Sequence, residues 1–101
     1  MMSPQVLTNL LNANLPALCF ELHEAEDFDQ EDHEIRILKD GKFTGYSVQH
    51  GPYGTLVNQY HYKDDQLESA SMAVTGVTDY VNPKTGALRS NDLIRDIREL
   101  F

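Results

Sequence analysis

The apolar residues at the start of the chain recur at intervals of three and four positions. This spacing, which would place them on one face of a helix, is shared by Val6, Leu7, Leu10, Leu11 and Leu15. Ser3 can cap such a helix, Pro4 suits its first turn, and Pro16 prevents its continuation. The pattern predicts a helix from Pro4 to about Asn14.

Apolar and polar residues alternate in the middle of the chain, as they do in half-buried strands. The predicted strands are residues 17–23, 34–38, 43–50, 55–63 and 67–74. Asp40-Gly41 predicts a tight hairpin turn, whereas the segment from His50 to Gly54 predicts a wide turn set by Pro and Gly. Residues 67–74 also fit a short helix by the spacing of their apolar residues, although a strand is favoured.

The end of the chain returns to helical spacing. Residues 76–90 show no regular pattern, and we interpret them as irregular. Ser90 or Asn91 would cap a final helix whose apolar face is Leu93, Ile94, Ile97, Leu100 and Phe101. The sequence thus predicts a single α+β domain over residues 1–101. It would be an antiparallel four- to five-stranded β-meander with an N-terminal and a C-terminal helix packed on one face.

The composition is that of an ordinary globular chain, with 41% hydrophobic and 24% charged residues in 101 positions. No apolar run approaches the roughly 20 residues that span a bilayer. The first residues lack the basic stretch of a secretory signal. Cys19 has no second cysteine to pair with, which favours a reducing compartment. We therefore expect a cytoplasmic protein without membrane contact.

The net charge of −8 is concentrated in the first third of the chain. Residues 1–35 contain eight acidic residues and no Lys or Arg, whereas residues 36–101 contain eight acids and eight bases. Direct nucleic-acid binding needs clustered Lys and Arg, so it is not expected. The segment from Glu21 to Glu34 would instead attract a basic protein partner, with the effect seen mainly in association rate and salt dependence.

The acidic loop, residues 24–33, has no calcium-binding pattern, because Asp32 stands where glycine is needed and Leu38 where a bidentate glutamate is needed. Two alternatives remain, a solvated loop and a docking surface for the basic partner. Phe28 would either anchor the loop to the core or make an apolar contact with that partner.

Three tyrosines extend the predicted docking surface beyond the loop. Tyr60 and Tyr62 share one face of their strand with Leu56, where they either border the core or form an exposed binding patch. The residues expected to contact the partner are Glu24, Glu26, Asp27, Phe28, Asp29, Glu31, Asp32, Tyr53, Tyr60 and Tyr62.

The chain shows no short catalytic or cofactor-binding motif, so no enzyme activity and no cofactor are predicted. Cys19 and His50 could in principle form a thiol–histidine pair, but Cys19 is interpreted as a small buried residue of an apolar strand. The spacing of His23, Asp27 and His33 matches no recognised ligand set, and no metal site is predicted.

Residues 39–69 begin with KDGKFTGY, and a related segment, KDDQLESA, begins 24 positions later at Lys63. This stretch resembles the hairpin repeats of MORN-type proteins, particularly those of antitoxin-like proteins, which combine an Asp-Gly-Lys turn with a glycine-aromatic pair. The second copy departs from that pattern, since Asp65 replaces the turn glycine and Ser69-Ala70 replaces the pair. The resemblance implies a role in protein interaction and no catalytic residues.

The leading hypothesis is an acidic inhibitor or immunity-type protein that binds a basic partner, such as a nuclease toxin or a nucleic-acid-handling complex, through the 21–34 segment. The alternative is a structural or assembly subunit, for instance a homodimer that pairs by its sheet edges or by the leucine face of the first helix. In that case the acidic loop would serve solubility only.

Overall fold

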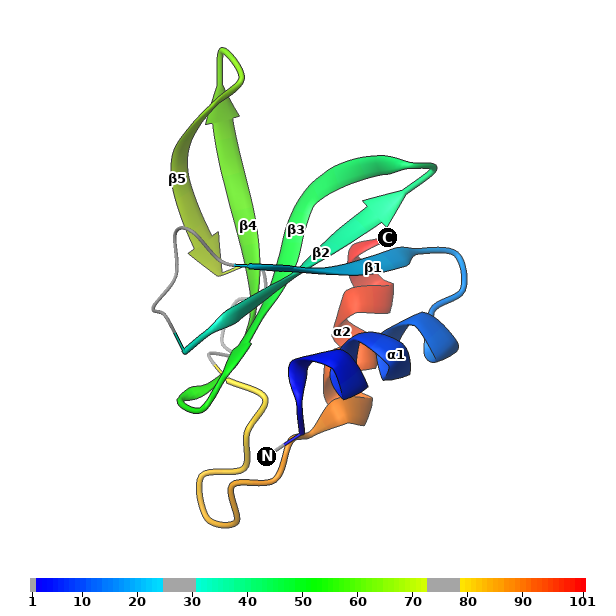
Figure 1. The fold of residues 1–101 in the computed structure, drawn as a ribbon, viewed down its shortest axis with the longest axis vertical. Coiled ribbons are helices and arrows are strands. Elements are labelled where there is room, and N and C mark those ends of the chain that lie inside the picture. The colour runs from blue at the N-terminus through cyan, green and yellow to red at the C-terminus, as the bar shows by residue number, and fades with distance from the viewer. Residues whose placement is uncertain (1, 25–30, 73–78) are drawn as a thin grey trace.

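The computed structural model describes residues 2–24, 31–72 and 79–101, excluding the side chains of Glu24 and Met72. Its helices and strands are, in chain order, α1 (Pro4–Asn14), β1 (Cys19–Glu24), β2 (His33–Lys39), β3 (Lys42–Gly51), β4 (Gly54–Lys63), β5 (Gln66–Met72) and α2 (Ser90–Leu100). The strands form one antiparallel sheet in the order β1-β2-β3-β4-β5, so every strand pairs with its neighbour in sequence (Figure 1). The predicted α+β meander with terminal helices is confirmed.

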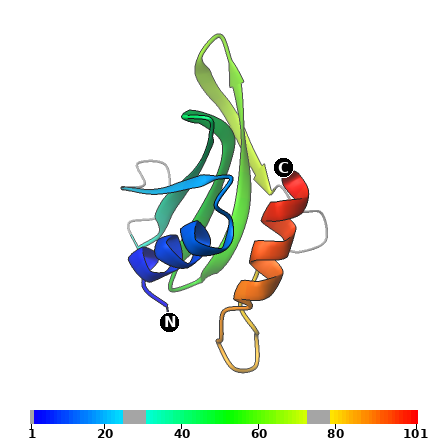
Figure 2. The ribbon, with the colours of Figure 1, turned by 90° about the vertical axis from the view of Figure 1, so that its right-hand side faces the viewer.

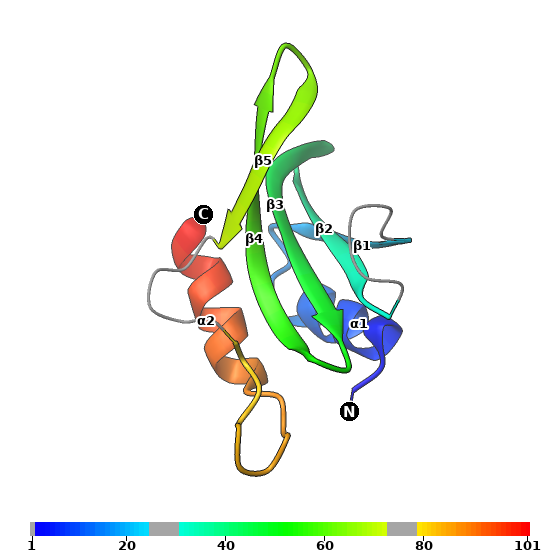
Figure 3. The same ribbon diagram turned by 90° about the vertical axis from the view of Figure 1, so that its left-hand side faces the viewer.

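Both helices cover the same face of the sheet. Figure 2 shows α1 in front of the strands, and the opposite view in Figure 3 shows it behind them. One hydrophobic core joins the helices to the sheet: Leu7, Leu11, Leu15, Leu18, Phe20, Ile35, Ile37, Val48, Val57, Tyr80, Leu93, Ile94 and Ile97. Leu7 and Leu11 are fully buried in this core. The leucines Leu7 and Leu11 of α1 are therefore occupied within the molecule, whereas the homodimer stays a prediction.

The strands alternate between the two faces of the sheet as their sequences predict. Ile35, Val48 and Val57 are paired across β2, β3 and β4, and all three side chains are buried. Their neighbours Glu34, Ser47 and Asn58 point to the opposite face, because successive side chains of a strand alternate. We call this second side, away from the helices, the open face.

The hairpin turns have the backbone that the Asp-Gly signal predicts. Asp40 and Gly41 have φ angles of 53° and 76°, and Asp64 and Asp65 have φ angles of 52° and 61°. Left-handed values at both central residues characterise the two-residue turns that match strand twist. The strand predicted at 67–74 is confirmed as far as Met72. The alternative prediction, a short helix, is wrong for these residues. Residues 73 and 74 lie outside the described residues.

Several predicted boundaries are corrected by the strand pairing. Glu24 and His33 are paired between β1 and β2, so the connection is shorter than the predicted loop of residues 24–33. The turn predicted to be wide is tight, because Gly51 pairs with Gly54 and only Pro52 and Tyr53 lie between them.

The start of α2 also differs from the prediction. Arg89 is the N-cap residue and makes no side-chain capping bond, whereas Ser90 is already helical. The Arg89 guanidinium pairs instead with the Asp92 carboxylate and donates to the carbonyl oxygen of Asp79.

The segment before α2 is more ordered than its sequence predicts. Tyr80 is 1% exposed and belongs to the core. Its backbone N–H donates to the carbonyl oxygen of Thr55 at 3.0 Å, and its carbonyl oxygen accepts from the Arg89 N–H at 2.7 Å. Val81 and Leu88 form a further antiparallel bridge. These bonds connect β4 to the beginning of α2.

The β4–β5 hairpin projects beyond the rest of the molecule (Figure 1). The side chains of residues 61–71 are all exposed, so this arm adds little to the core. Among the helices of the described residues, none is long and apolar enough to cross a membrane.

Candidate functional site

Half of the predicted contact residues can be placed in the structure. Glu26, Asp27, Phe28 and Asp29 lie outside the described residues, as does the side chain of Glu24. Glu31 is exposed, and Asp32 is partly exposed just before β2. The three tyrosines separate into two groups, with Tyr53 at the β3–β4 turn and Tyr60 and Tyr62 farther along β4.

The structure brings Asp32 and Tyr53 together. Both line a hollow of about 120 Å³ at the β3–β4 turn, formed by Asp32, Gln49, Tyr53, Gly54, Leu56 and Asp79. We call it the Tyr53 hollow. The Tyr53 side chain is 78% exposed, although it is a large aromatic residue. Two carboxylates, an amide and an aromatic ring thus surround one small space, and none of its described lining residues is Lys or Arg.

Asp32 is held in place by a chain of amide hydrogen bonds along the open face. The Asn58 side-chain amide donates to Gln49 at 2.8 Å, and the Gln49 amide donates to Oδ2 of Asp32 at 2.7 Å. Oδ1 of Asp32 lies over Gly51, and a Cβ atom at that glycine would be 2.9 Å from Cγ of Asp32. Glycine is required here by the close approach of the carboxylate.

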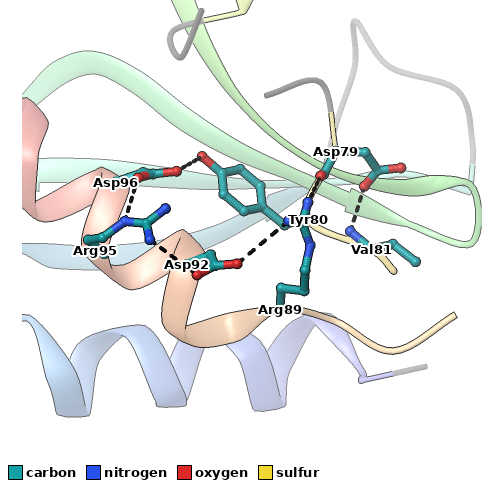
Figure 4. A network of polar contacts seen from close by, with 7 residues as sticks. All are labelled: Asp79, Tyr80, Val81, Arg89, Asp92, Arg95 and Asp96. Carbon is teal, nitrogen blue, oxygen red and sulfur yellow. Dashed lines mark hydrogen bonds and ion pairs between the residues drawn. The ribbon is translucent and has the colours of Figure 1, made fainter. Parts of the chain in front are cut away.

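Asp79 is fixed from the other side of the same turn (Figure 4). Its Oδ1 accepts from the backbone N–H groups of Thr55 at 2.9 Å and Val81 at 3.0 Å. A Cβ atom at Gly54 would be 2.9 Å from Cγ of Asp79, and Gly54 has a φ of 147°, which strongly favours glycine. The two carboxylates therefore lie on either side of the turn that presents Tyr53.

A polar network extends from Asp79 along the first turns of α2. Arg89 connects Asp79 to Asp92, and Arg95 connects Asp92, at 3.3 Å, to Asp96, at 3.1 Å (Figure 4). Arg89 and Arg95 are thus paired with the nearby carboxylates of Asp92 and Asp96. Among the described residues, no ion pair joins Arg89 or Arg95 to Glu31 or Asp32.

The middle of the open face is a layer of buried polar side chains. Glu34 is only 6% exposed, and its carboxylate lies 3.3 Å from Nε of Arg36. Burial raises the pKa of the neighbouring Tyr60 phenol, with opposing contributions from the Ser47 hydroxyl, which lowers it, and Glu34, which raises it. Glu34 and Tyr60 therefore form part of a packed polar layer and are poorly placed to contact a partner.

Tyr62 differs from Tyr60 in being 49% exposed. Its ring packs edge-on against Phe43, with 6.5 Å between centroids, and Arg36 covers Phe43 at 5.0 Å. Tyr60 thus borders a second, smaller core on the open face, whereas Tyr62 presents an aromatic surface on the hairpin arm. Of the two alternatives predicted for these tyrosines, a border of the core describes Tyr60 and an exposed surface describes Tyr62.

The geometry excludes the thiol–histidine pair. Cys19 pairs with Leu38 at one end of β2, and His50 pairs with His33 at the other end, so the two side chains cannot meet. Cys19 is exposed, which corrects the prediction that it is buried; its side chain points to the open face on an edge strand. No cluster of three potential metal ligands occurs within the described ranges.

His50 has a structural environment. It is 1% exposed, with Nδ1 2.7 Å from the Thr55 hydroxyl and Nε2 2.6 Å from the carbonyl oxygen of Met2. Both ring nitrogens are thus engaged in hydrogen bonds.

Comparisons with known proteins give no further guidance. No protein-family model matches the chain, and searches of curated proteins and of solved structures give no match either. The resemblance to MORN-type repeats stays a prediction.

Sequence reasoning missed Asp79, Gln49 and Leu56 as members of the hollow. Asp79 lies in the segment interpreted as irregular, where Asp79-Tyr80-Val81 places an acid beside two residues suited to a core. From this local pattern, Asp79 could have been predicted to lie close to the core. Gln49 and Leu56 carry no such signal, because only strand pairing places them together.

Proposed function

We propose that this protein is a small acidic interaction module of the inhibitor or immunity type, which binds a basic protein partner such as a nuclease toxin or a nucleic-acid-handling complex. The observation that carries the proposal is the Tyr53 hollow, where Asp32 and Asp79 lie on either side of an exposed aromatic ring. A lysine or arginine of the partner would pair with the carboxylates and rest on the Tyr53 ring.

The hollow is suited to this role because its acids are held before binding. Asp32 is oriented by Gln49, and Asp79 by two backbone N–H groups, so little side-chain freedom is lost when a cation enters. In each carboxylate, one oxygen accepts no hydrogen bond from a described residue. That oxygen is available to a charged donor.

A partner that handles nucleic acid would carry the cations that this hollow is suited to bind. A protein that handles nucleic acid uses lysine and arginine to contact phosphate. When one of those cations occupies the Tyr53 hollow, it is withdrawn from its phosphate. The excess negative charge of the 21–34 segment would raise the rate of encounter.

Titration with an arginine-rich peptide at low salt, followed by calorimetry, tests the hollow directly. Asp32→Asn should weaken binding about fivefold or more, because it removes one charge from the pair of acids. Tyr53→Ala should weaken it by a similar factor through loss of the ring. Asp64→Asn is the matched control, since it removes one charge from an exposed turn, and it should change affinity less than about twofold.

Equal binding by wild type, Asp32→Asn and Tyr53→Ala would contradict the proposal. The natural partner is then sought by passing native lysate over two columns at low salt, one with wild type and one with the Asp32→Asn/Tyr53→Ala variant. Proteins that only the wild-type column retains, and that elute as salt rises, are the candidates for inhibition assays.

A further inference from the structure

A second hollow, of opposite sign, lies at the other end of β3. Its volume is about 350 Å³, within the range typical of small-molecule sites. It is formed where the segment after α1, the end of β2 and the end of α2 meet. The lining residues are Asn14, Leu15, Pro16, Ala17, Leu18, Lys39, Arg98 and Phe101. We call it the Lys39 groove.

The floor of the Lys39 groove is apolar and anchored to the core. Leu15 and Leu18 are 6% and 9% exposed, and both belong to the hydrophobic core. Phe101 is 41% exposed and packs edge-on against Tyr46, with 5.4 Å between ring centroids. The groove thus offers the aliphatic surface of two core leucines together with the aromatic ring of Phe101.

Two cations border this apolar floor. Within the described residues, the side chains of Lys39 and Arg98 form no ion pair and no hydrogen bond, whereas Arg36, Arg89 and Arg95 are all paired with acids. Lys42, Lys63 and Lys84 are likewise in no described ion pair, but Lys39 and Arg98 are the two bases that line one apolar groove together. Their charge is complementary to an anion.

We propose that the Lys39 groove binds a small apolar carboxylate, with its hydrocarbon part on Leu15, Leu18 and Phe101 and its carboxylate between Lys39 and Arg98. The apolar floor excludes strongly hydrated anions such as inorganic phosphate, because they would leave that surface unfilled. The positive charges of Lys39 and Arg98 would repel amines. The site shares no residue with the Tyr53 hollow, so it is independent of the proposed protein partner.

Octanoate is a suitable probe, with octanol and octylammonium as matched neutral and cationic ligands. In ¹⁵N-labelled full chain, octanoate should shift the amide signals of Ala17, Leu18, Lys39 and Phe101 in a saturable manner. Octanol should bind about tenfold more weakly, because it lacks the charge-assisted bonds, and octylammonium should give no saturable shift. The proposal is overturned if all three ligands act alike, or if the octanoate shifts lie elsewhere.

Three variants separate charge from shape. Lys39→Gln/Arg98→Gln should reduce octanoate affinity about tenfold while octanol affinity stays the same. Lys63→Gln/Lys84→Gln, which has the same net charge, should bind octanoate like wild type. Ala17→Trp, at an exposed position, should block the groove for octanoate and octanol without loss of fold. Undiminished octanoate binding by the Lys39→Gln/Arg98→Gln variant would disprove the proposed role of the cations.

Discussion

The Tyr80 side chain connects α2 to the sheet through both its ring and its hydroxyl group. The ring lies in the main core, and the hydroxyl donates to Oδ2 of Asp96 at 2.9 Å. Asp96 is 7% exposed, and its other oxygen accepts from Arg95. A buried carboxylate is stable only when its oxygens have partners, so Tyr80 and Asp96 depend on each other.

The ionisation of Tyr80 and Tyr60 predicts how stability changes at alkaline pH. Burial raises the pKa of both phenols above the ordinary value of about 10, and the Asp96 hydrogen bond raises that of Tyr80 further. The unfolded chain therefore loses these protons first. The contribution of each tyrosine to the free energy of unfolding should be constant below about pH 10 and fall above it by about 1.4 kcal/mol per pH unit.

Tyr80→Phe tests this sign by urea unfolding at several pH values. It should remove one tyrosine's share of the alkaline slope and, at pH 7, lower stability by about 1–2 kcal/mol, because Asp96 loses a donor. Tyr46→Phe is the control, since the Tyr46 hydroxyl makes no hydrogen bond with a described residue, and it should be nearly neutral. An unchanged alkaline slope in Tyr80→Phe would contradict the assignment.

Individual residues were the least predictable level of the structure. Cys19 was expected to be buried from its apolar neighbours, but strand alternation places it on the open face. The burial of Tyr80 could not be predicted, because this residue lies in a polar segment and a single buried residue creates no periodicity. Asp32 was identified by charge alone, and its position beside Tyr53 depends on pairing between distant strands.

The two edge strands of the sheet are protected to different degrees. On β1, the Asn12 side chain accepts from the backbone N–H of Phe20 at 2.9 Å and donates to its carbonyl oxygen at 3.0 Å. Helix α1 thus covers part of that edge and reduces its capacity to pair with another chain. The exposed β5 has no buried side chain among residues 66–71.

The turn between β4 and β5 can be improved by one substitution. Asp65 has a φ of 61°, a conformation that glycine adopts without the steric cost that a side chain adds. Asp65→Gly should stabilise the hairpin by about 0.5–1 kcal/mol, seen as slower hydrogen exchange of the β5 amides. Asp65→Ala removes the same charge but keeps Cβ, and it should speed exchange. Equal effects of the two variants would show that charge, not backbone strain, is responsible.

Helices and strands were largely predictable because each has one buried face, which imposes a clear period on the sequence. The helix at Pro4–Asn14 was predicted with its observed bounds, and β2 to β4 within one or two residues. The start of α2 was not, because Arg89 has contacts outside the helix that favour its position over capping by Ser90. Such tertiary contacts leave no local pattern.

The whole molecule combines a packed body with a weakly attached arm. Ile35 and Val48 are fully buried in the centre of the sheet, whereas residues 61–71 are all exposed. Local opening of the arm exposes little apolar surface, so its free energy is much smaller than that of global unfolding.

Native-state hydrogen exchange should reveal this division. The paired amides of β5 should exchange about a hundredfold faster, or more, than those of Ile35 and Val48. The hydrogen-bonded amides of β1, another edge strand, should be intermediate or slow, because Phe20 is buried and its edge is covered by Asn12. Equal protection of β5 and β2 would mean that the chain opens as one cooperative unit.

β3 separates the Tyr53 hollow from the Lys39 groove by its full length. Its ten residues extend on the order of 30 Å, with Asp32 and Asp79 near Gly51 and Gly54 at one end and Lys39 beside Lys42 at the other. Opposite charges at this separation would contribute a dipole moment directed along β3. A basic surface would rotate the molecule so that Tyr53 arrives first and the groove faces solvent. Both ligands could then be held at once, in a ternary complex.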